Sequence, residues 1–339
     1  MENSHQYVGL SSSELASLWT QYQDDSMAIC FSSHSLVNIE DQDVREIFEH
    51  ALRLSKLHIK EITEFFNQEN YPVPKGFTNE DVNLDAPALF SDLVLLHYIF
   101  VMTLQGLTGY AGAIGSSVRA DVRSYFKKCN TETMQLYDEI VEIMLQKGTF
   151  NRPPSLNAPD HIDFVKDQNY LNGWFGKQRP LNAVEISGLT FNSQKLFMKI
   201  VLEMGFSQVT NSKELRKYFQ RGESICKKHT KAMSSILRDS NLTPPRSWES
   251  EITNSTIAPF SNKLMLFHVS TLVTTAIGFY GAGLSTVQRR DLGIKYTSLI
   301  ADIMLYAEDG TNLMIKNGWL EQPPMASDRQ ELAEKNESP

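Results

Sequence analysis

The sequence has few cysteines, and they do not form a motif. Three cysteines are scattered over 339 residues with no short spacing between them, so a disulfide framework is not indicated. The N-terminus is polar and lacks the basic and apolar regions of a secretory signal. We therefore expect a reducing, cytoplasmic location.

Positive charge is also scarce. The chain has 32 Lys and Arg against 40 Asp and Glu, which gives a formal net charge of -8, and it has no basic cluster. This charge is unsuited to a protein whose main partner is the phosphate backbone of a nucleic acid. No nucleic-acid partner is predicted.

Motifs of common enzyme classes are missing as well. The sequence has no Gly-x-Ser-x-Gly, no P-loop, no dinucleotide fingerprint and no Cys-x-x-Cys. A hydrolase or a nucleotide-binding enzyme therefore has no support, and the sequence favours a protein that is not an enzyme.

What the sequence does contain is an internal duplication. Motifs recur 170 or 171 residues apart over most of the chain: His58 and His229, Pro74 and Pro245, Tyr110 and Tyr280, Arg119/Asp121 and Arg289/Asp291, Gly148 and Gly318, 153–154 and 323–324. A period this long indicates that a whole domain was copied, and not a short solenoid unit.

Each copy has the pattern of four helices, and strand signals are almost absent. The second helix is the clearest, because the apolar residues that recur at helical spacing from residue 44 return 171 residues later. The predicted helices are residues 12–36, 41–65, 93–118 and 120–147, and then 183–205, 215–236, 264–287 and 290–316.

A long polar connection separates the second and third helices of each copy, which is typical of a ferritin-like bundle. We therefore predict an all-α protein of two tandem ferritin-like four-helix bundles. The predicted domains are a first bundle at 1–150, an aromatic and proline-rich connecting segment at 151–180, a second bundle at 181–326 and a polar tail at 327–339. The connecting segment contains Phe164, Trp174 and Phe175, and we expect it to pack against the bundles.

Residues 93–118 and 264–287 contain no charged residue, and both exceed the roughly 20 residues that a membrane span requires. They are either membrane spans or the central helices of large bundles. Both carry His, Ser, Thr and Gly, and neither flank is enriched in Lys or Arg. We favour central helices and predict no membrane span. Their glycines are expected to mark the close approach of a neighbouring helix, which would offset the helix-destabilising effect of glycine.

A dinuclear metal site in a ferritin-like bundle uses Glu-x-x-His on two helices. The only such spacing here joins Glu2 and His5, in the N-terminal tail. The dinuclear signature is therefore absent from the predicted helices, and no cofactor is predicted.

Four other residues are candidate metal ligands. His58 and His229 lie on the apolar face of the second helix of each copy, Asp92 begins the third helix at a place from which it can meet His58, and His268 lies further along the equivalent helix. The first interpretation of each is a core residue that is hydrogen-bonded to its neighbours. The alternative is a ligand of Fe, Zn or Mn.

Several segments of the sequence also resemble a known family. The residues that carry the resemblance are 74–78, 81–84, 86–87 and 89–92 in the first copy and 163–165, 205–209, 258–261, 307–310 and 317–324 in the second. They resemble the family called domain of unknown function 3231, which consists of two-repeat proteins of spore-forming bacteria. Ala88 and Asn262 stand where the family pattern has Arg and Asp, which puts a charged site at both positions in doubt.

The resemblance implies tandem ferritin-like bundles, and some relatives are labelled spore coat proteins. We predict a helical structural or interaction protein associated with sporulation or the spore coat, with a protein partner or a second copy bound through its helical surfaces. The alternative is a metal-binding protein or a metal-dependent oxidoreductase of the ferritin-like type.

Overall fold

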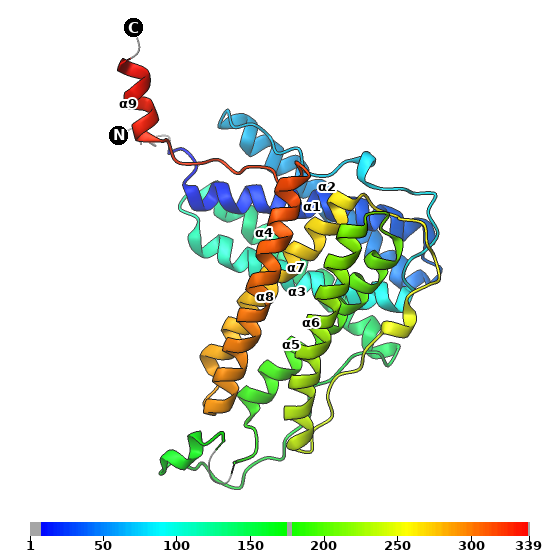
Figure 1. The fold of residues 1–339 in the computed structure, drawn as a ribbon, viewed down its shortest axis with the longest axis vertical. Coiled ribbons are helices and arrows are strands. Elements are labelled where there is room, and N and C mark those ends of the chain that lie inside the picture. Colours follow the sequence, from blue (N-terminus) through cyan, green and yellow to red (C-terminus); the bar gives the residue numbers. More distant parts are fainter. Residues whose placement is uncertain (1–7, 175–177, 338–339) are drawn as a thin grey trace.

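The computed structural model describes residues 8–174 and 178–337. Within these ranges the chain forms nine α-helices and no strand (Figure 1). The first half contains α1 (Ser12–Asn38), α2 (Gln42–Gln68), α3 (Asp92–Ser116) and α4 (Ala120–Gln146), and the second half contains α5 (Ala183–Val209), α6 (Lys213–Asp239), α7 (Asn262–Thr286) and α8 (Arg290–Lys316). The predictions of an all-helical class and of two repeated halves are confirmed.

Equivalent carboxylates begin the two halves. Ser11 and Glu14 form a capping box at the start of α1, and Asn182 and Glu185 form one at the start of α5. The Glu14 carboxylate also accepts hydrogen bonds from two backbone N–H groups at the start of α4, and Glu185 does the same at the start of α8. Each carboxylate therefore joins the first helix of its half to the fourth.

Equivalent glycines follow the fourth helix of each half. Gly148 has φ +66° and Gly318 has φ +67°, in the left-handed region where a residue with a Cβ is strained. Backbone N–H groups after these glycines bond back to carbonyls in the last turn of α4 and α8. The repeated glycine thus ends the helix in both halves.

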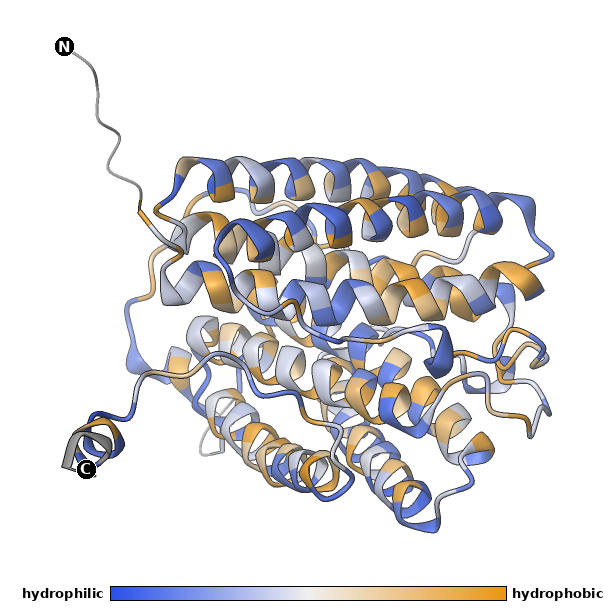
Figure 2. Cartoon of the chain, turned by 90° about the horizontal axis from the view of Figure 1, so that it is seen from above, coloured by the Kyte–Doolittle hydropathy of each residue, from blue (hydrophilic) through white to orange (hydrophobic). Residues whose placement is uncertain are grey.

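The apolar core is shared between the halves. One cluster belongs to the first half and another to the second, but the largest cluster contains residues of both. Phe31 of α1 stacks on Phe260, with ring centroids 5.1 Å apart, and Phe90 contacts Phe206. Figure 2 shows that polar residues concentrate on the outward faces of the helices. A core common to both halves was not predicted.

The two long crossovers pair with each other across this core. Val82 bridges to Phe260, and Phe90 bridges to Ile252. Residues 82 and 252 occupy equivalent positions of the repeat, as do 90 and 260. Each bridge is therefore the copy of the other, which is the reciprocal pattern of a two-fold symmetric interface.

Side chains beside the bridges follow the same reciprocal pattern. Ser91 donates to the carboxylate of Glu251 at 3.1 Å, and Ser261 donates to the carboxylate of Asp81 at 2.7 Å. On the axis itself, Tyr98 meets its own equivalent, His268, with 3.3 Å between the hydroxyl oxygen and Nε2. The halves are thus related by a pseudo-two-fold axis that passes between α3 and α7.

Helices α3 and α7 are long and apolar enough to cross a membrane by length and composition alone. In each, half of the most apolar 18-residue window is buried inside the protein, where Tyr98 and His268 bring the two helices together. Each of the two helices therefore contributes part of its apolar surface to the core that the halves share.

The expectation for the glycines of these helices is mostly wrong. A Cβ at Gly109, Gly112 or Gly115 would meet no atom within 4 Å, so no helix approaches closely there. At Gly283 the expectation holds, because a Cβ would lie 2.8 Å from the Tyr296 ring.

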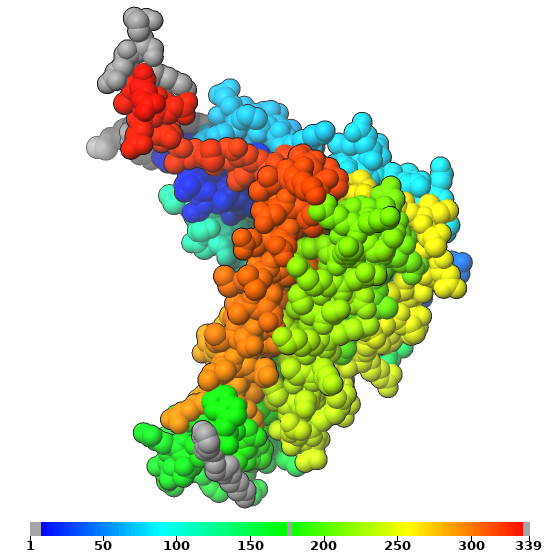
Figure 3. All heavy atoms as spheres, in the orientation of Figure 1, coloured from blue at the N-terminus to red at the C-terminus, as the bar shows by residue number. Residues whose placement is uncertain are grey.

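The connecting segment packs only at its ends. Near its end Arg179 lies over the Tyr170 ring and pairs with Glu185. In contrast to the prediction, Phe164 is 78% exposed and Trp174 is 56% exposed, while Phe175 lies outside the described residues. The predicted polar tail contains a further helix, α9 (Arg329–Glu337), which stands away from the other helices in Figures 1 and 3.

Candidate functional site

His58 lies between two carboxylates. It is buried on α2, with Nδ1 3.2 Å from Asp25 of α1 and Nε2 3.4 Å from Glu132 of α4. Burial alone would lower the pKa of His58, but the hydrogen bond to Asp25 and its negative charge outweigh burial and raise this pKa well above its ordinary value of 6.5. The side chain is therefore an imidazolium that joins three helices.

His229, the equivalent residue, has different partners. Its Nδ1 lies 3.0 Å from the Tyr280 hydroxyl, and its Nε2 lies 3.2 Å from Asp302. Burial is the largest effect and lowers the pKa of His229, against the opposing effect of Asp302. The arrangement suits a neutral imidazole that donates from Nε2 and accepts from the tyrosine.

Asp92 does not meet His58. Its carboxylate accepts hydrogen bonds from the backbone N–H groups of Glu40 and Asp41, at 3.0 and 2.7 Å. The equivalent Asn262 bonds to Thr210 and Asn211 in the same turn of the second half. The expected pairing of Asp92 with His58 is therefore wrong, and both side chains hold the turn between the first two helices of their half.

His268 is fully buried on the pseudo-two-fold axis. Tyr98 is its polar contact, and burial lowers the pKa of His268 to about 3. The structure therefore places the four predicted ligands in four separate surroundings. Among residues 8–174 and 178–337, no group of three or more His, Cys, Asp or Glu side chains is placed to hold a metal ion. Glu2 and His5 lie outside these ranges.

The sequence analysis missed a buried charge pair on α5. Lys199 donates to Glu203 at 2.6 Å, and Tyr306 of α8 donates to the same carboxylate oxygen at 3.0 Å. Burial raises the pKa of the Glu203 carboxyl, although the Lys199 ammonium opposes this. A signal for the pair was present, because two opposite charges four residues apart interrupt an otherwise apolar run.

A second missed residue is Lys195, one turn before Lys199. Its Nζ is buried, and it has no hydrogen-bond partner among the residues that the structure describes. It lies 3.4 Å from the centroid of the Phe191 ring and 2.7 Å from that of Phe279. Lys195 lines a cleft between α3 of the first half and α5 and α7 of the second.

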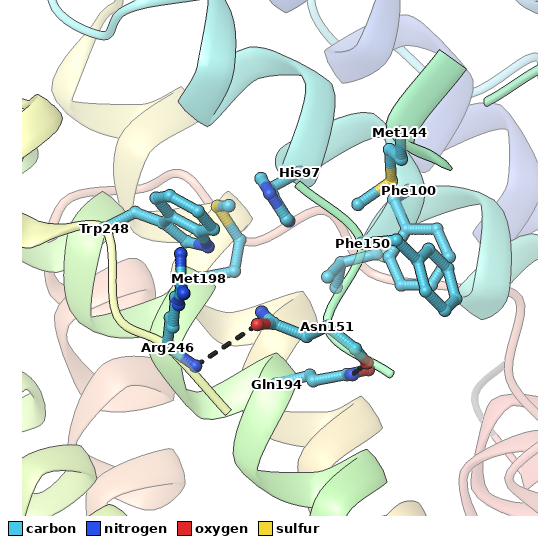
Figure 4. Close-up of a pocket in the computed structure, with 10 residues that line it drawn as sticks. His97, Phe100, Met144, Phe150, Asn151, Gln194, Met198, Arg246 and Trp248 are labelled. Carbon is cyan, nitrogen blue, oxygen red and sulfur yellow. Dashed lines mark hydrogen bonds between the residues drawn. The ribbon is translucent and has the colours of Figure 1, made fainter. Parts of the chain in front are cut away.

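Another cleft lies between the halves where the connecting segment begins (Figure 4). His97 packs beside Trp248, with ring centroids 4.5 Å apart, and burial lowers the pKa of His97 to about 4. Asn151 accepts hydrogen bonds from Gln194 and from the backbone of Arg246. Half of the lining residues are aromatic or methionine side chains, and the rest include the polar residues His97, Asn151, Gln194 and Arg246.

Two of three comparisons with known proteins found a similar family or structure. The model of a family described as "Protein of unknown function (DUF3231)" matches it twice, over residues 2–162 and 169–332. No curated protein matches it. Among solved structures, a "putative spore coat protein" from Bacillus halodurans C-125 is similar, with 20% sequence identity, a TM-score of 0.40, and an alignment that covers 45% of this chain and 98% of that one.

Proposed function

Because the chain belongs to the DUF3231 family, whose function is unknown, we propose its role from the arrangement of its residues. The protein is a structural or interaction protein without catalytic activity. It consists of two tandem ferritin-like four-helix bundles, at 1–150 and 181–326, which are joined by the segment 151–180 and followed by the tail 327–339.

The observation that carries this proposal is how the buried polar side chains are used. His58 and His229 each join the second helix of a half to its fourth helix, through Glu132 and Asp302. Glu14 and Glu185 each join the first helix to the fourth. Buried polar groups that recur in both halves and bond helix to helix stabilise a scaffold.

Metal analysis tests this proposal. The protein is produced with iron, zinc and manganese supplied, and the metal content is measured after purification. We expect traces only, and a melting temperature that a chelator leaves unchanged. Near-stoichiometric metal, lost in His58→Ala but retained in His50→Ala, would contradict the proposal. His50 is a suitable control because its ion pair with Glu139 lies at the surface.

A metal-binding protein or metal-dependent oxidoreductase of the ferritin-like type is the second candidate. The observation that favours it is the convergence of Asp25 and Glu132 on the two nitrogens of His58. A metal ion would have to displace the proton of the imidazolium, and the three side chains would have to rearrange around it. Fe, Zn and Mn are the ions to test, with His229 and His268 as further ligands to substitute.

An interaction role also needs a surface. Met134 of α4 and Met304 of α8 are equivalent exposed residues, and so are Leu145 and Ile315, with exposed fractions from 38% to 60%. These positions support contact with a protein partner or a second copy. Light scattering on the purified protein tests this, since a strict monomer would rule out the second copy.

For its location we propose the cell interior, with a spore association as the family resemblance implies. All three cysteines are buried and unpaired, which is consistent with a reducing compartment. Immunoblots of vegetative cells, mother cells and purified spores test the proposal. Detection in secreted or membrane fractions alone would contradict it.

A further inference from the structure

The cleft around Lys195 combines apolar walls with unpaired polar atoms. The lining residues that matter here come from three helices: Gln105 of α3, Lys195 and Leu196 of α5, and Leu272, Ala276 and Phe279 of α7. Besides Lys195 Nζ, the side-chain oxygen Oε1 of Gln105 is buried, and it has no partner among the described residues. Ligand sites in proteins commonly have this composition, with apolar walls and a few polar atoms that fix orientation.

The charged groups around Lys195 do not neutralise it. Lys199 is the nearest ionisable residue on the same helix, and it is itself cationic. The Glu203 carboxylate is bound by Lys199 and by Tyr306. Buried charges in proteins are normally paired, and Lys195 is an exception that faces a cleft.

The first half has an acidic side chain at the equivalent position. Asp24 of α1 is the equivalent of Lys195, and it also is a buried ionisable residue. Burial raises the pKa of Asp24 to about 7, and its Oδ1 has no hydrogen-bond partner among the described residues. A buried carboxyl can take up a proton and become neutral, whereas the charge of Lys195 can be balanced by an anion in the cleft.

We propose that this cleft binds a small monocarboxylate with an apolar body, and that the carboxylate pairs with Lys195. The anion supplies the missing charge partner of the ammonium, and the apolar body lies against Leu196, Leu272 and Ala276. Inorganic phosphate or sulfate fits less well, because such ions lack an apolar part to cover these walls. Burial lowers the pKa of Lys195 to about 6, but the two phenyl faces, which attract a cation, oppose that shift.

Titration calorimetry with benzoate tests the proposal on the full chain. We expect one benzoate per chain. Benzamide, which has the same shape without the charge, and acetate, which has the charge without the apolar body, should each bind at least about tenfold more weakly. Equal binding of benzoate and benzamide would show that Lys195 supplies no charge pairing and would overturn the proposal.

Variants locate the binding. Lys195→Met keeps the length of the side chain and should weaken benzoate binding by at least about tenfold. The control Lys166→Met removes the same charge from a side chain that is 84% exposed, and it should leave binding unchanged. Ala276→Leu fills the cleft and should abolish binding while Lys195 remains. Circular dichroism melting confirms that each variant is folded.

Two other results would also overturn the proposal. One is benzoate binding that persists in both Lys195→Met and Ala276→Leu, because the anion then binds elsewhere. The other is that the wild type does not bind benzoate. In that case, borohydride reduction in the presence of benzaldehyde tests whether Lys195 reacts with an aldehyde, and the proposal fails with either result. Trapping would assign the cleft to carbonyl compounds that form an imine with the amine and release water.

Discussion

The two halves have the same helices but place their buried charges differently. In the first half Asp25 faces His58 and keeps it charged, whereas Leu196 is the equivalent residue in the second half and His229 is neutral. In the second half Lys199 and Glu203 form a buried pair, whereas the equivalent residues of the first half are Ala28 and Ser32. One helical frame therefore tolerates two different sets of internal charges.

The comparison also shows what a buried charge pair requires from its neighbours. A Cβ at Gly222 of α6 would clash with the Glu203 carboxylate and the Tyr306 hydroxyl. The equivalents of Gly222 and Tyr306 in the first half are Ala51 and Leu136. The second half thus combines two charges, a tyrosine that bonds to one of them and a glycine that makes room.

The largest expected effect is the loss of one member of this pair. Glu203→Ala leaves the Lys199 ammonium buried without a carboxylate, and it should lower the free energy of unfolding by about 3–5 kcal/mol. Lys199→Ala with Glu203→Ser, the residues of the first half, should recover most of this loss. Urea denaturation measures both. A double variant no more stable than Glu203→Ala would show that the pair itself, and not the uncompensated charge, supplies the stability.

The glycine is expected to depend on the pair. Gly222→Ala alone should destabilise the protein by about 1–3 kcal/mol, because the core is overpacked. In the Lys199→Ala, Glu203→Ser, Tyr306→Leu background, which has the residues of the first half at all three positions, the same substitution should be neutral or stabilise by up to about 1 kcal/mol, the helix preference for alanine. The control is Ala51→Gly, which should cost roughly 1 kcal/mol. If Gly222→Ala lowers the free energy of unfolding equally in both backgrounds, the added Cβ does not clash with the replaced side chains.

The charged histidine should make stability depend on pH. The folded pKa of His58 is raised, so its stabilising effect is complete below the unfolded value of about 6.5 and is lost as the pH rises toward the folded value. Between pH 7 and 9 the free energy of unfolding should therefore fall by about 1–2 kcal/mol more in the wild type than in Asp25→Asn.

The matched control for this prediction is Asp302→Asn, which changes the partner of the neutral His229. In Asp302→Asn the free energy of unfolding should fall between pH 7 and 9 by as much as in the wild type. Urea denaturation at both pH values decides the point, and an equal difference in Asp25→Asn and the wild type would show that His58 is not the group responsible.

The smallest effects concern the pseudo-two-fold interface, where the halves should respond alike. Ser91 and Ser261 each cap a helix and donate to a carboxylate of the other half. Replacing either with Ala should cost about 1 kcal/mol, and the two losses should agree within about 0.5 kcal/mol. Ser224→Ala, at an exposed site, should cost less. Thermal melting of the three variants measures the ranking. Unequal losses of stability at the two caps would show that the two halves do not contribute equally to the interface.

Much of the fold could be predicted from the sequence, because repetition doubles the evidence for each helix. The apolar face of α2 recurs in α6, and the observed bounds of the eight predicted helices are within about four residues of the predicted ones. The interface between the halves could not be predicted, since its backbone bridges join Val82 to Phe260 and Phe90 to Ile252 in connections whose sequences have no strand pattern.

The candidate site could be predicted from the sequence less well than the fold. The sequence placed His58 and His229 inside the protein, and both are buried. It could not name their partners, because Asp25 lies on another helix whose rotation about its axis is fixed only by packing. Lys195 is an ordinary lysine in the sequence, and what sets it apart is the burial of Nζ. The exposed Phe164 shows the converse, since aromatic content alone does not provide a surface to pack against.

The contact between Tyr98 and His268 has a consequence for the origin of the chain. In a dimer of identical subunits, a side chain on the symmetry axis can meet only its own twin, so two tyrosines or two histidines would face each other there. Joining both copies in one polypeptide lets each change alone, and a phenol can then sit against an imidazole. The covalent link thus opens combinations along the axis that symmetry forbids to separate subunits.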